Sequence, residues 1–337
     1  MTLPASGQIS ASDIANEFGY THNPETKLGS YRTTNGQGNF PVSFGALQFN
    51  SIDAQSGGSV PTSGQIKFSD FYSTKLQTVV NFYGSGRGGN RLVAKDRYDA
   101  GGSNDVNIVG NYRARPTNSS GTKVHIHVNQ TIGSEKTRVE HCALRTGSWN
   151  SSTTLQVDVG GSGRIGGAGG DGGDGGTPFS PGDGTSGTSG LGIQYNPTTV
   201  NVASGGVITA GFGGGGGGGG AYDTDKEATR TASGGGGGGG AGIPAGEGGA
   251  AGTGSSHNAN GGPGNDGSIS EGGAGGGGAS NDGEAVSAGG GAVGEGSTYG
   301  GGDPGSAGAA IRRNTGFVVN VTNNGSINGV QNATTVL

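Results

Sequence analysis

The sequence has few of the residues that build a conventional globular core. Only 28% of its 337 residues are hydrophobic and 6% are aromatic, which excludes one large apolar core. The single cysteine, Cys142, excludes an intrachain disulfide framework. No apolar run approaches the ~18 residues that cross a membrane, and the start at Met1 has the pattern of neither a signal peptide nor a lipid anchor. We therefore expect several small units, made in a reducing cytoplasm and not inserted in a membrane.

The charged residues exclude further classes of function. The formal net charge is −5, and acids outnumber the basic residues Arg164, Lys226 and Arg230 between positions 160 and 308. A nucleic acid partner is therefore not expected. Segment 84–89 is rich in glycine but lacks the Lys-Ser/Thr pair of a phosphate-binding loop. No other catalytic constellation stands out, so we expect a protein that is not an enzyme and has no cofactor.

The abundant residue is glycine, with 83 copies that concentrate between positions 160 and 308. Within segment 166–176, Ala168, Asp171 and Asp174 recur at every third position in a background of glycine. This period is typical of a polyglycine-II helix, a threefold extended helix without internal hydrogen bonds. We expect the three side chains to line one outward, solvated face of such a helix.

Two other glycine-rich structures are open alternatives. Collagen needs an unbroken Gly-X-Y register and more proline than this chain contains. A disordered linker avoids the entropy cost of ordering glycine. The all-glycine runs at 213–220 and 234–240, which carry no side chain, fit polyglycine-II helices that neighbours surround on all sides.

Three matched motifs frame the glycine-rich segments and favour an ordered bundle. The pattern Val-x-Val-x3-Gly-x-Ile-x-Gly spans 157–167 and returns position for position at 319–329, while a copy ending in alanine spans 200–210. Alternating β-branched residues followed by glycine predict a strand, a tight turn and a second short strand. Such elements would fix where each glycine-rich helix starts, which a linker does not need.

An internal repeat marks residues 1–76. The segment at 3–9, which ends in Pro-Ala-Ser-Gly-Gln-Ile, returns at 60–66 as Val-Pro-Thr-Ser-Gly-Gln-Ile. Proline with Ser-Gly indicates a turn, and the Ser-Asp pairs at 12–13 and 69–70 are typical of the start of a short helix. The repeat is too small to serve alone, and we interpret it as a docking module.

Residues 77–154 contain alternating apolar segments between glycine, asparagine and serine turns, which predict a small antiparallel β-sandwich. His125 and His127 would share one face of a strand, with His141 and Glu140 on a neighbouring strand. His-x-His is a spacing found in metal sites, so we consider a metal at His125 and His127. The alternative is a pair of polar side chains on the solvent face.

Two parts of the chain resemble known phage proteins. Modules of the form Ser-Gly-x-Ile-x-x-Ser-Asp-Ile/Phe, with Glu-Phe-Gly at 17–19 and Phe-Tyr at 71–72, are common in tail-associated structural proteins of tailed bacteriophages. Residues 155–337, with all-glycine runs, short polar loops and the closing segment 305–327, are similar to tip adhesins of T-even-type long tail fibres. The resemblance implies a polyglycine-II sandwich whose loops at one end bind the host receptor.

The expected fold class is mainly β plus polyglycine-II. We expect an N-terminal docking module at 1–76, a β-sandwich-like domain at 77–154, and a polyglycine-II helix sandwich at 155–337 that is framed by the three β elements.

Helices that each reverse the direction of the last would place the longer loops at one end and the shorter turns at the other. The longer loops are 221–233, 253–260 and 279–288. The shorter turns are 243–245, 265–271 and 295–299. Long loops on a rigid scaffold are typical of recognition sites. The candidate receptor-binding residues are Tyr222, Asp223, Asp225, Lys226, Arg230, His257, Asn258, Asn260, Asn281, Asp282 and Glu284.

We therefore expect a noncatalytic phage tail adhesin, located in the virion. It would bind an outer-membrane protein or surface glycan of the host, and other tail or fibre proteins through residues 1–76. Three alternatives stay open: a structural tail component without receptor binding, a glycine-rich ice-binding protein, and a capsule depolymerase. The last would use Asp171 and Asp174, although few aromatic residues are present to wall a sugar groove. A homotrimer is an alternative to a monomer.

Overall fold

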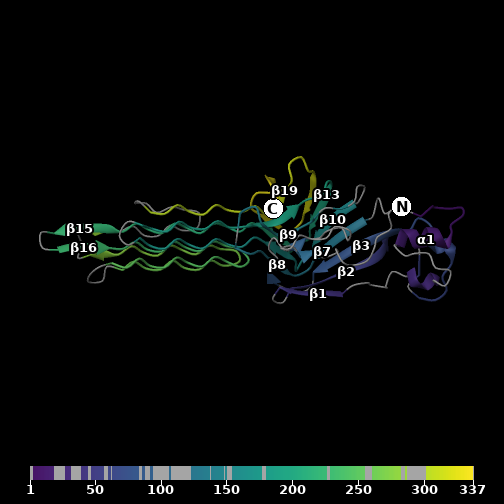
Figure 1. Ribbon diagram of the computed structural model, residues 1–337, viewed down its shortest axis with the longest axis horizontal. Helices are drawn as coiled ribbons and strands as arrows, with labels where there is room; N and C mark the ends of the chain where they lie inside the picture. The colour runs from purple at the N-terminus through teal and green to yellow at the C-terminus, as the bar shows by residue number, and fades with distance from the viewer. Residues whose placement is uncertain are drawn as a thin grey trace.

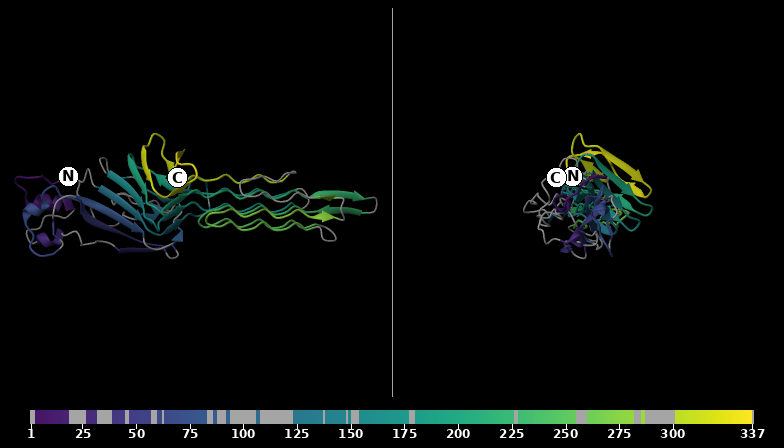
Figure 2. Two further views of the ribbon diagram at one scale, coloured as in Figure 1. Left: turned by 180° about the vertical axis from the view of Figure 1, so that it is seen from behind. Right: turned by 90° about the vertical axis from the view of Figure 1, so that its right-hand side faces the viewer.

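The computed structural model of the chain is elongated. It describes residues 3–18, 27–31, 39–44, 47–56, 60–61, 63–82, 86–87, 92–93, 106–107, 123–136, 138–147, 149, 154–176, 180–225, 228–254, 260–281, 285–286 and 301–336. Helix α1 (Ala11–Phe18) lies at one end, β-sheets fill the middle, and β15 (Ala221–Asp225) and β16 (Ala228–Ala232) lie at the far end of long extended segments (Figure 1). The view from behind shows the same length, and the end-on view shows the narrow cross-section (Figure 2).

The two copies of the N-terminal repeat fold against each other. Leu3 and Ile14 of the first copy pack in one buried cluster with Val60 and Phe71, their counterparts in the second. The Leu3 N–H donates to the Thr74 carbonyl at 2.9 Å. Besides α1, this region contains the 3-10 helices η1 (Leu28–Tyr31) and η2 (Phe68–Phe71). Neither copy has a separate core, so the repeat forms one unit.

Helix α1 begins earlier than the Ser-Asp pair predicted. Ser10 is the capping residue: its Oγ accepts the Asp13 N–H at 3.1 Å, and Asp13 Oδ2 accepts the Ser10 N–H at 2.8 Å. This reciprocal capping box lowers the pKa of Asp13, chiefly through the hydrogen bond from the Ser10 side chain. In the second copy, Asp70 Oδ2 likewise accepts the Lys67 N–H at 2.7 Å. The aspartate therefore lies in the first turn rather than at the cap.

Three sheets form the middle of the molecule. The first has the order β1 (Asn39–Phe44), β2 (Leu47–Ser56), β3 (Lys75–Phe82), β7 (Lys123–Val128), β10 (Thr154–Val159), β13 (Thr198–Val202) and β20 (Val319–Asn323). The second has the order β21 (Ser326–Asn328), β14 (Val207–Thr209), β11 (Arg164–Gly166), β8 (Thr131–Gly133) and β4 (Gly86–Arg87). The third has the order β22 (Ala333–Thr334), β19 (Ile311–Arg313), β12 (Ser189–Ile193), β9 (Cys142–Arg145), β5 (Leu92–Val93) and β6 (Val106–Asn107).

The chain visits the three sheets in turn, so that strands of successive passes stack in parallel. One pass, which we call a coil, runs through β7, β8 and β9, and the next runs through β10, β11 and β12. Within the three sheets, the antiparallel pairs are β1 with β2 and β2 with β3. The described strands thus build a stack of triangular coils.

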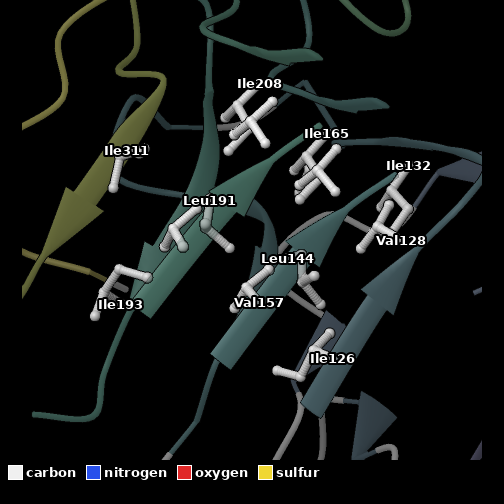
Figure 3. Packing of buried hydrophobic residues seen from close by; sticks show 14 of the residues in the cluster. Ile126, Val128, Ile132, Leu144, Val157, Ile165, Leu191, Ile193, Ile208 and Ile311 are labelled. Atoms are coloured by element: carbon white, nitrogen blue, oxygen red, sulfur yellow. The ribbon is translucent and has the colours of Figure 1, made fainter. Parts of the chain in front are cut away.

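The core is a set of ladders that run between the coils. Ile132, Ile165 and Ile208 are aligned across the second sheet, and all three are buried. Leu144, Leu191 and Ile311 form a similar ladder in the third sheet (Figure 3). Ile126, Val157 and Val200 form one in the first sheet. Because successive coils each add an apolar side chain to these ladders, a chain with few hydrophobic residues still builds a continuous core within the stack.

The antiparallel sandwich expected for residues 77–154 is wrong. β3 pairs with β7, and β7 with β10, in parallel, so strands from this segment and from 155–337 share one sheet. Alternating apolar residues indicate which face of a strand is buried but not the direction of its partner. The described connection at residues 129–130 leads from β7 into β8 of the second sheet, so it is a corner of a coil rather than a reversal within one sheet.

The framing motifs are coil corners, and their alignment needs one correction. Val157 lies beside Val200, and Ile165 beside Ile208 and then Ile327, as the motif predicts. However, Val200 pairs with Val321 rather than with Val319. The connection from β20 to β21 is shorter than that from β13 to β14, which shifts the first strand while the isoleucine stays in register.

Extended glycine-rich segments leave the stack after β11 and β14 and return to it at β12 and β19 (Figures 1 and 2). We call them rods; they comprise residues 167–176, 181–188, 211–220, 233–242, 246–254, 260–267, 272–279 and 301–308. Their backbone bonds repeat every third residue. Gly170, Gly173 and Gly176 donate to Phe212, Gly215 and Gly218, and Gly169, Gly172 and Gly175 donate to Pro244, Glu247 and Ala250. Each rod is therefore bonded to several neighbours at once.

The solvated face expected for Ala168, Asp171 and Asp174 is correct for Asp174, which is exposed, but wrong for Ala168. Ala168 is fully buried. Asp171 Oδ1 accepts the Glu247 N–H at 2.8 Å and bonds Lys136 Nζ at 2.6 Å, and Asp174 Oδ1 accepts the Ala250 N–H at 2.8 Å. The period predicts that these side chains share a face, but it does not reveal that another rod lies along that face.

The direction of the last rod also differs from the prediction. Gly302, Gly305 and Gly308 donate to Gly217, Gly214 and Gly211 in turn, so rod 301–308 runs towards the sheets, opposite to rod 211–220. If each rod reversed the direction of the one before, with the turn 295–299 at the sheet end, this rod would run away from the sheets. The turn 295–299, expected at the sheet end, lies outside the described residues.

Candidate functional site

The end of the rods furthest from α1, which we call the tip, gathers the three longer loops. Ser233, fully buried, is the residue that joins them. Its Oγ donates to the Gly252 carbonyl at 2.7 Å and accepts the Gly261 N–H at 2.9 Å, while its own carbonyl accepts the Ala279 N–H at 3.2 Å. The starts or ends of the three predicted loops therefore lie at one place, as the sequence predicts.

The longest tip loop is a β-hairpin. β15 and β16 pair in an antiparallel register that sets Tyr222 opposite Thr231 and Asp223 opposite Arg230. Asp225 pairs with Ala228 at the end of the ladder, and Lys226 lies outside the described residues. The hairpin thus brings an aromatic residue, two acids and an arginine to the extreme end of the molecule (Figure 1).

The other two loops contribute fewer described candidates. Asn260 is exposed, and its Oδ1 accepts the Gly254 N–H at 3.0 Å, which closes the base of its loop; His257 and Asn258 lie outside the described residues. Asn281 belongs to β17 (Ser280–Asn281), which pairs with β18 (Ala285–Val286). β18 lies against β15, so two hairpins meet at the tip. Asp282 and Glu284 lie outside the described residues.

The opposite end of the rods is built against the sheets. The Ile243 carbonyl accepts the Ser134 N–H at 2.9 Å, and its N–H donates to the Gly167 carbonyl at 2.7 Å. Ile243 and Ile269 also line a cavity of about 280 Å³, together with Arg164 and Phe212. These turns hold the rods on the stack, whereas the tip loops project from them.

The predicted histidine pair lies in the first sheet, on β7, and it has a third member that sequence reasoning missed. Asp158 Oδ2 lies 3.6 Å from His127 Nδ1 and 3.9 Å from His125 Nδ1. Asp158 is on β10, directly opposite His127. Parallel pairing of successive coils is the signal that would have found it, because it aligns residues 31 positions apart along the chain.

His141 and Glu140, expected beside this pair, are elsewhere. His141 directly precedes β9, which belongs to the third sheet, whereas β7 belongs to the first. Partial burial lowers the pKa of His141, and Arg138 and Arg145 lower it further. Its neighbour Cys142 is fully buried, which raises the pKa of the thiol to about 12. That thiol is therefore not an activated nucleophile.

Two further features concern the part of the chain that the structure describes. Within it, His125, His127 and Asp158 form the one group of three or more potential ligand residues close enough to hold a metal ion. No helix in the same residues is both long and apolar enough to traverse a membrane.

Comparison with known proteins identifies one family. The model of the family described as phage tail fibre adhesin Gp38 matches residues 94–332, which is most of the chain. Neither a curated protein nor a solved structure matches the sequence.

Proposed function

Because this chain belongs to the phage tail fibre adhesin Gp38 family, we propose that it is the receptor-binding protein of a phage tail and that its tip is the binding surface. The family implies a location in the virion tail. The single observation that carries the proposal is the convergence of two hairpins and the Asn260 loop at the end of the molecule furthest from α1.

The rods supply the rigidity that such a surface requires. We propose that they are polyglycine-II helices, because one rod bonds to two neighbours with a period of three. A third set of bonds joins Ala168 N–H and Asp171 N–H to the Oγ1 atoms of Thr188 and Thr185, at 2.8 and 2.6 Å. A scaffold held by backbone bonds tolerates changes in the loops that it presents.

The chemistry of the hairpin fits recognition of a host surface protein or glycan. Tyrosine and arginine are enriched among residues that dominate binding energy, and Tyr222, Asp223 and Arg230 lie within two adjacent rungs of one ladder. Residues 1–76, at the other end, would join the protein to other tail or fibre proteins.

We further propose that the protein is not an enzyme. Asp171 and Asp174, the acids that a depolymerase would have used, accept hydrogen bonds from the backbone of a neighbouring rod. These bonds give the two carboxylates a structural role.

The test is an exchange of the hairpin 221–232 for that of another Gp38-family adhesin with a different host. We expect the host range of the phage to follow the hairpin, while the melting temperature of the protein stays unchanged. As a matched control, the exposed turn around Thr315 and Gly316, which lies beside the sheets, is exchanged in the same way and leaves host range unchanged. If the control alters the host range and the hairpin does not, the tip is not the receptor-binding surface. Release of reducing sugar from host capsule would identify a depolymerase instead.

A further inference from the structure

His125, His127 and Asp158 are arranged as ligands around one point. The two histidines belong to one strand and Asp158 to the next, and the parallel register aligns Asp158 with His127. One ligand atom from each residue lies within 4.8 Å of the others. In a tetrahedral zinc site with bonds of about 2.0–2.2 Å, ligand atoms lie roughly 3.3–3.6 Å apart. The distances of 3.6 and 3.9 Å between the histidine Nδ1 atoms and Asp158 Oδ2 are close to that spacing.

The carboxylate of Asp158 is held in the orientation that a ligand needs. Its Oδ1 accepts hydrogen bonds from Gln156 Nε2 at 2.7 Å and from Asn201 Nδ2 at 2.8 Å. These bonds occupy one oxygen and leave Oδ2 on the side of the histidines. Outer-shell hydrogen bonds of this kind orient metal-binding carboxylates in proteins.

The strand that carries the two histidines is anchored in the core. Val124, Ile126 and Val128 alternate with the histidines on β7, and all three are fully buried in the core. The site itself is partly open, since the side chains of His125, His127 and Asp158 are 14%, 33% and 24% exposed. An ion and a bound water can therefore reach it without movement of the backbone.

We propose that His125, His127 and Asp158 bind a divalent first-row transition metal, with Zn²⁺ as the best match. Two imidazole nitrogens and one carboxylate oxygen suit Zn²⁺, whereas Ca²⁺ and Mg²⁺ prefer sites made of oxygen alone. The three side chains leave one position for water. The ion would fasten β7 to β10 and so join two successive coils of the stack.

The first experiment uses the full-length protein after treatment with EDTA and dialysis. Isothermal titration with ZnCl₂ is expected to give one bound ion per chain, and differential scanning calorimetry a higher melting temperature with Zn²⁺ but not with Mg²⁺. Co²⁺ is expected to produce the intense visible absorption of a tetrahedral site. A wild-type protein that takes up no Zn²⁺ would show that the cluster is only a set of hydrogen-bonded polar residues, and would overturn the proposal.

Variants assign the ligands. His127→Gln and Asp158→Asn, which preserve size, are expected to weaken zinc binding at least 100-fold. Asn201→Leu, which removes an outer-shell bond, is expected to weaken it about 10- to 100-fold. His141→Gln, directly before β9 and away from the first sheet, is the matched control and is expected to bind as the wild type does. The far-UV circular dichroism of each variant shows whether it is folded, and the Asn201 and Asp158 variants leave both histidines in place. Unchanged affinity in folded Asp158→Asn and His127→Gln would place the metal elsewhere and refute the site.

Discussion

At the scale of single residues, the rods need glycine where a backbone carbonyl of the next rod occupies the place of a side chain. A Cβ on Gly237 would lie 2.1 Å from the Gly215 carbonyl oxygen, and one on Gly216 would lie 1.9 Å from that of Gly302. A Cβ on Gly277 would meet no atom within 4 Å. The glycines of the rods are therefore not equivalent, because some face a neighbouring backbone and others face open space.

This difference predicts opposite outcomes for the same substitution. Gly237→Ala is expected to lower the free energy of unfolding by about 1–3 kcal/mol, the usual cost of overpacking, because two rods must move apart. Gly277→Ala is expected to be neutral or to stabilise by up to about 1 kcal/mol, since alanine restricts the unfolded chain more than glycine does. Chemical denaturation of the two purified variants measures both values. Equal stability of the two would contradict close contact between the rods at Gly237.

At the scale of elements, polar side chains on the rods replace backbone acceptors. Thr185 and Thr188 accept N–H groups of rod 167–176, and Asp183 Oδ1 accepts the Asp303 N–H at 2.8 Å. At the tip, Ser233 Oγ both donates and accepts between two rods. A rod can therefore carry polar residues where they bond to a neighbour.

Ser233→Ala tests this role at the tip. It leaves the partly buried Gly261 N–H and the Gly252 carbonyl without this partner, which is expected to cost about 1–3 kcal/mol of unfolding free energy. Hydrogen exchange should accelerate at Gly261 and stay slow at Gly237, in the middle of a rod. Ser270→Ala, at an exposed position of the sheet end, is the control and should change neither quantity. Unaltered exchange at Gly261 in Ser233→Ala would show that the hydroxyl does not hold the loops together.

Sequence patterns predict these elements better than their partners. The framing motifs identify the coil corners, and the glycine period identifies the segments that become rods. The pairing of Asp158 with His127, and of Asp171 with Glu247, joins residues far apart in the chain, so no local period contains it. Direction is equally non-local, because apolar alternation is the same in parallel and antiparallel strands. Apolar alternation therefore predicts a sandwich where the structure has a stack of coils, and a simple alternation of rod direction fails for the last rod.

At the scale of the whole molecule, the N-terminal module and the tip lie at opposite ends of a long, narrow particle (Figure 1). The module is held together by its own cluster around Phe71, and the tip by bonds around Ser233. The stack of coils and the rods lie between them, so the two ends are far apart. The proposed functions, attachment to the tail and binding to the host, should therefore be separable.

A short peptide tag inserted at either end tests this separation. A tag between β15 and β16, at residues 226–227, is expected to leave the number of copies per virion unchanged, to be bound by antibody on intact phage, and to reduce adsorption to the host. A tag between Ala5 and Ser6, in an exposed part of the N-terminal module, is expected to reduce the number of copies per virion, while the purified protein still binds host cells. Quantitative immunoblots of purified phage and adsorption assays measure the two effects. If the tag at 226–227 abolished incorporation, or the tag at Ala5 abolished cell binding by the purified protein, the molecule would be oriented the other way, with the rods buried in the tail and residues 1–76 facing the host.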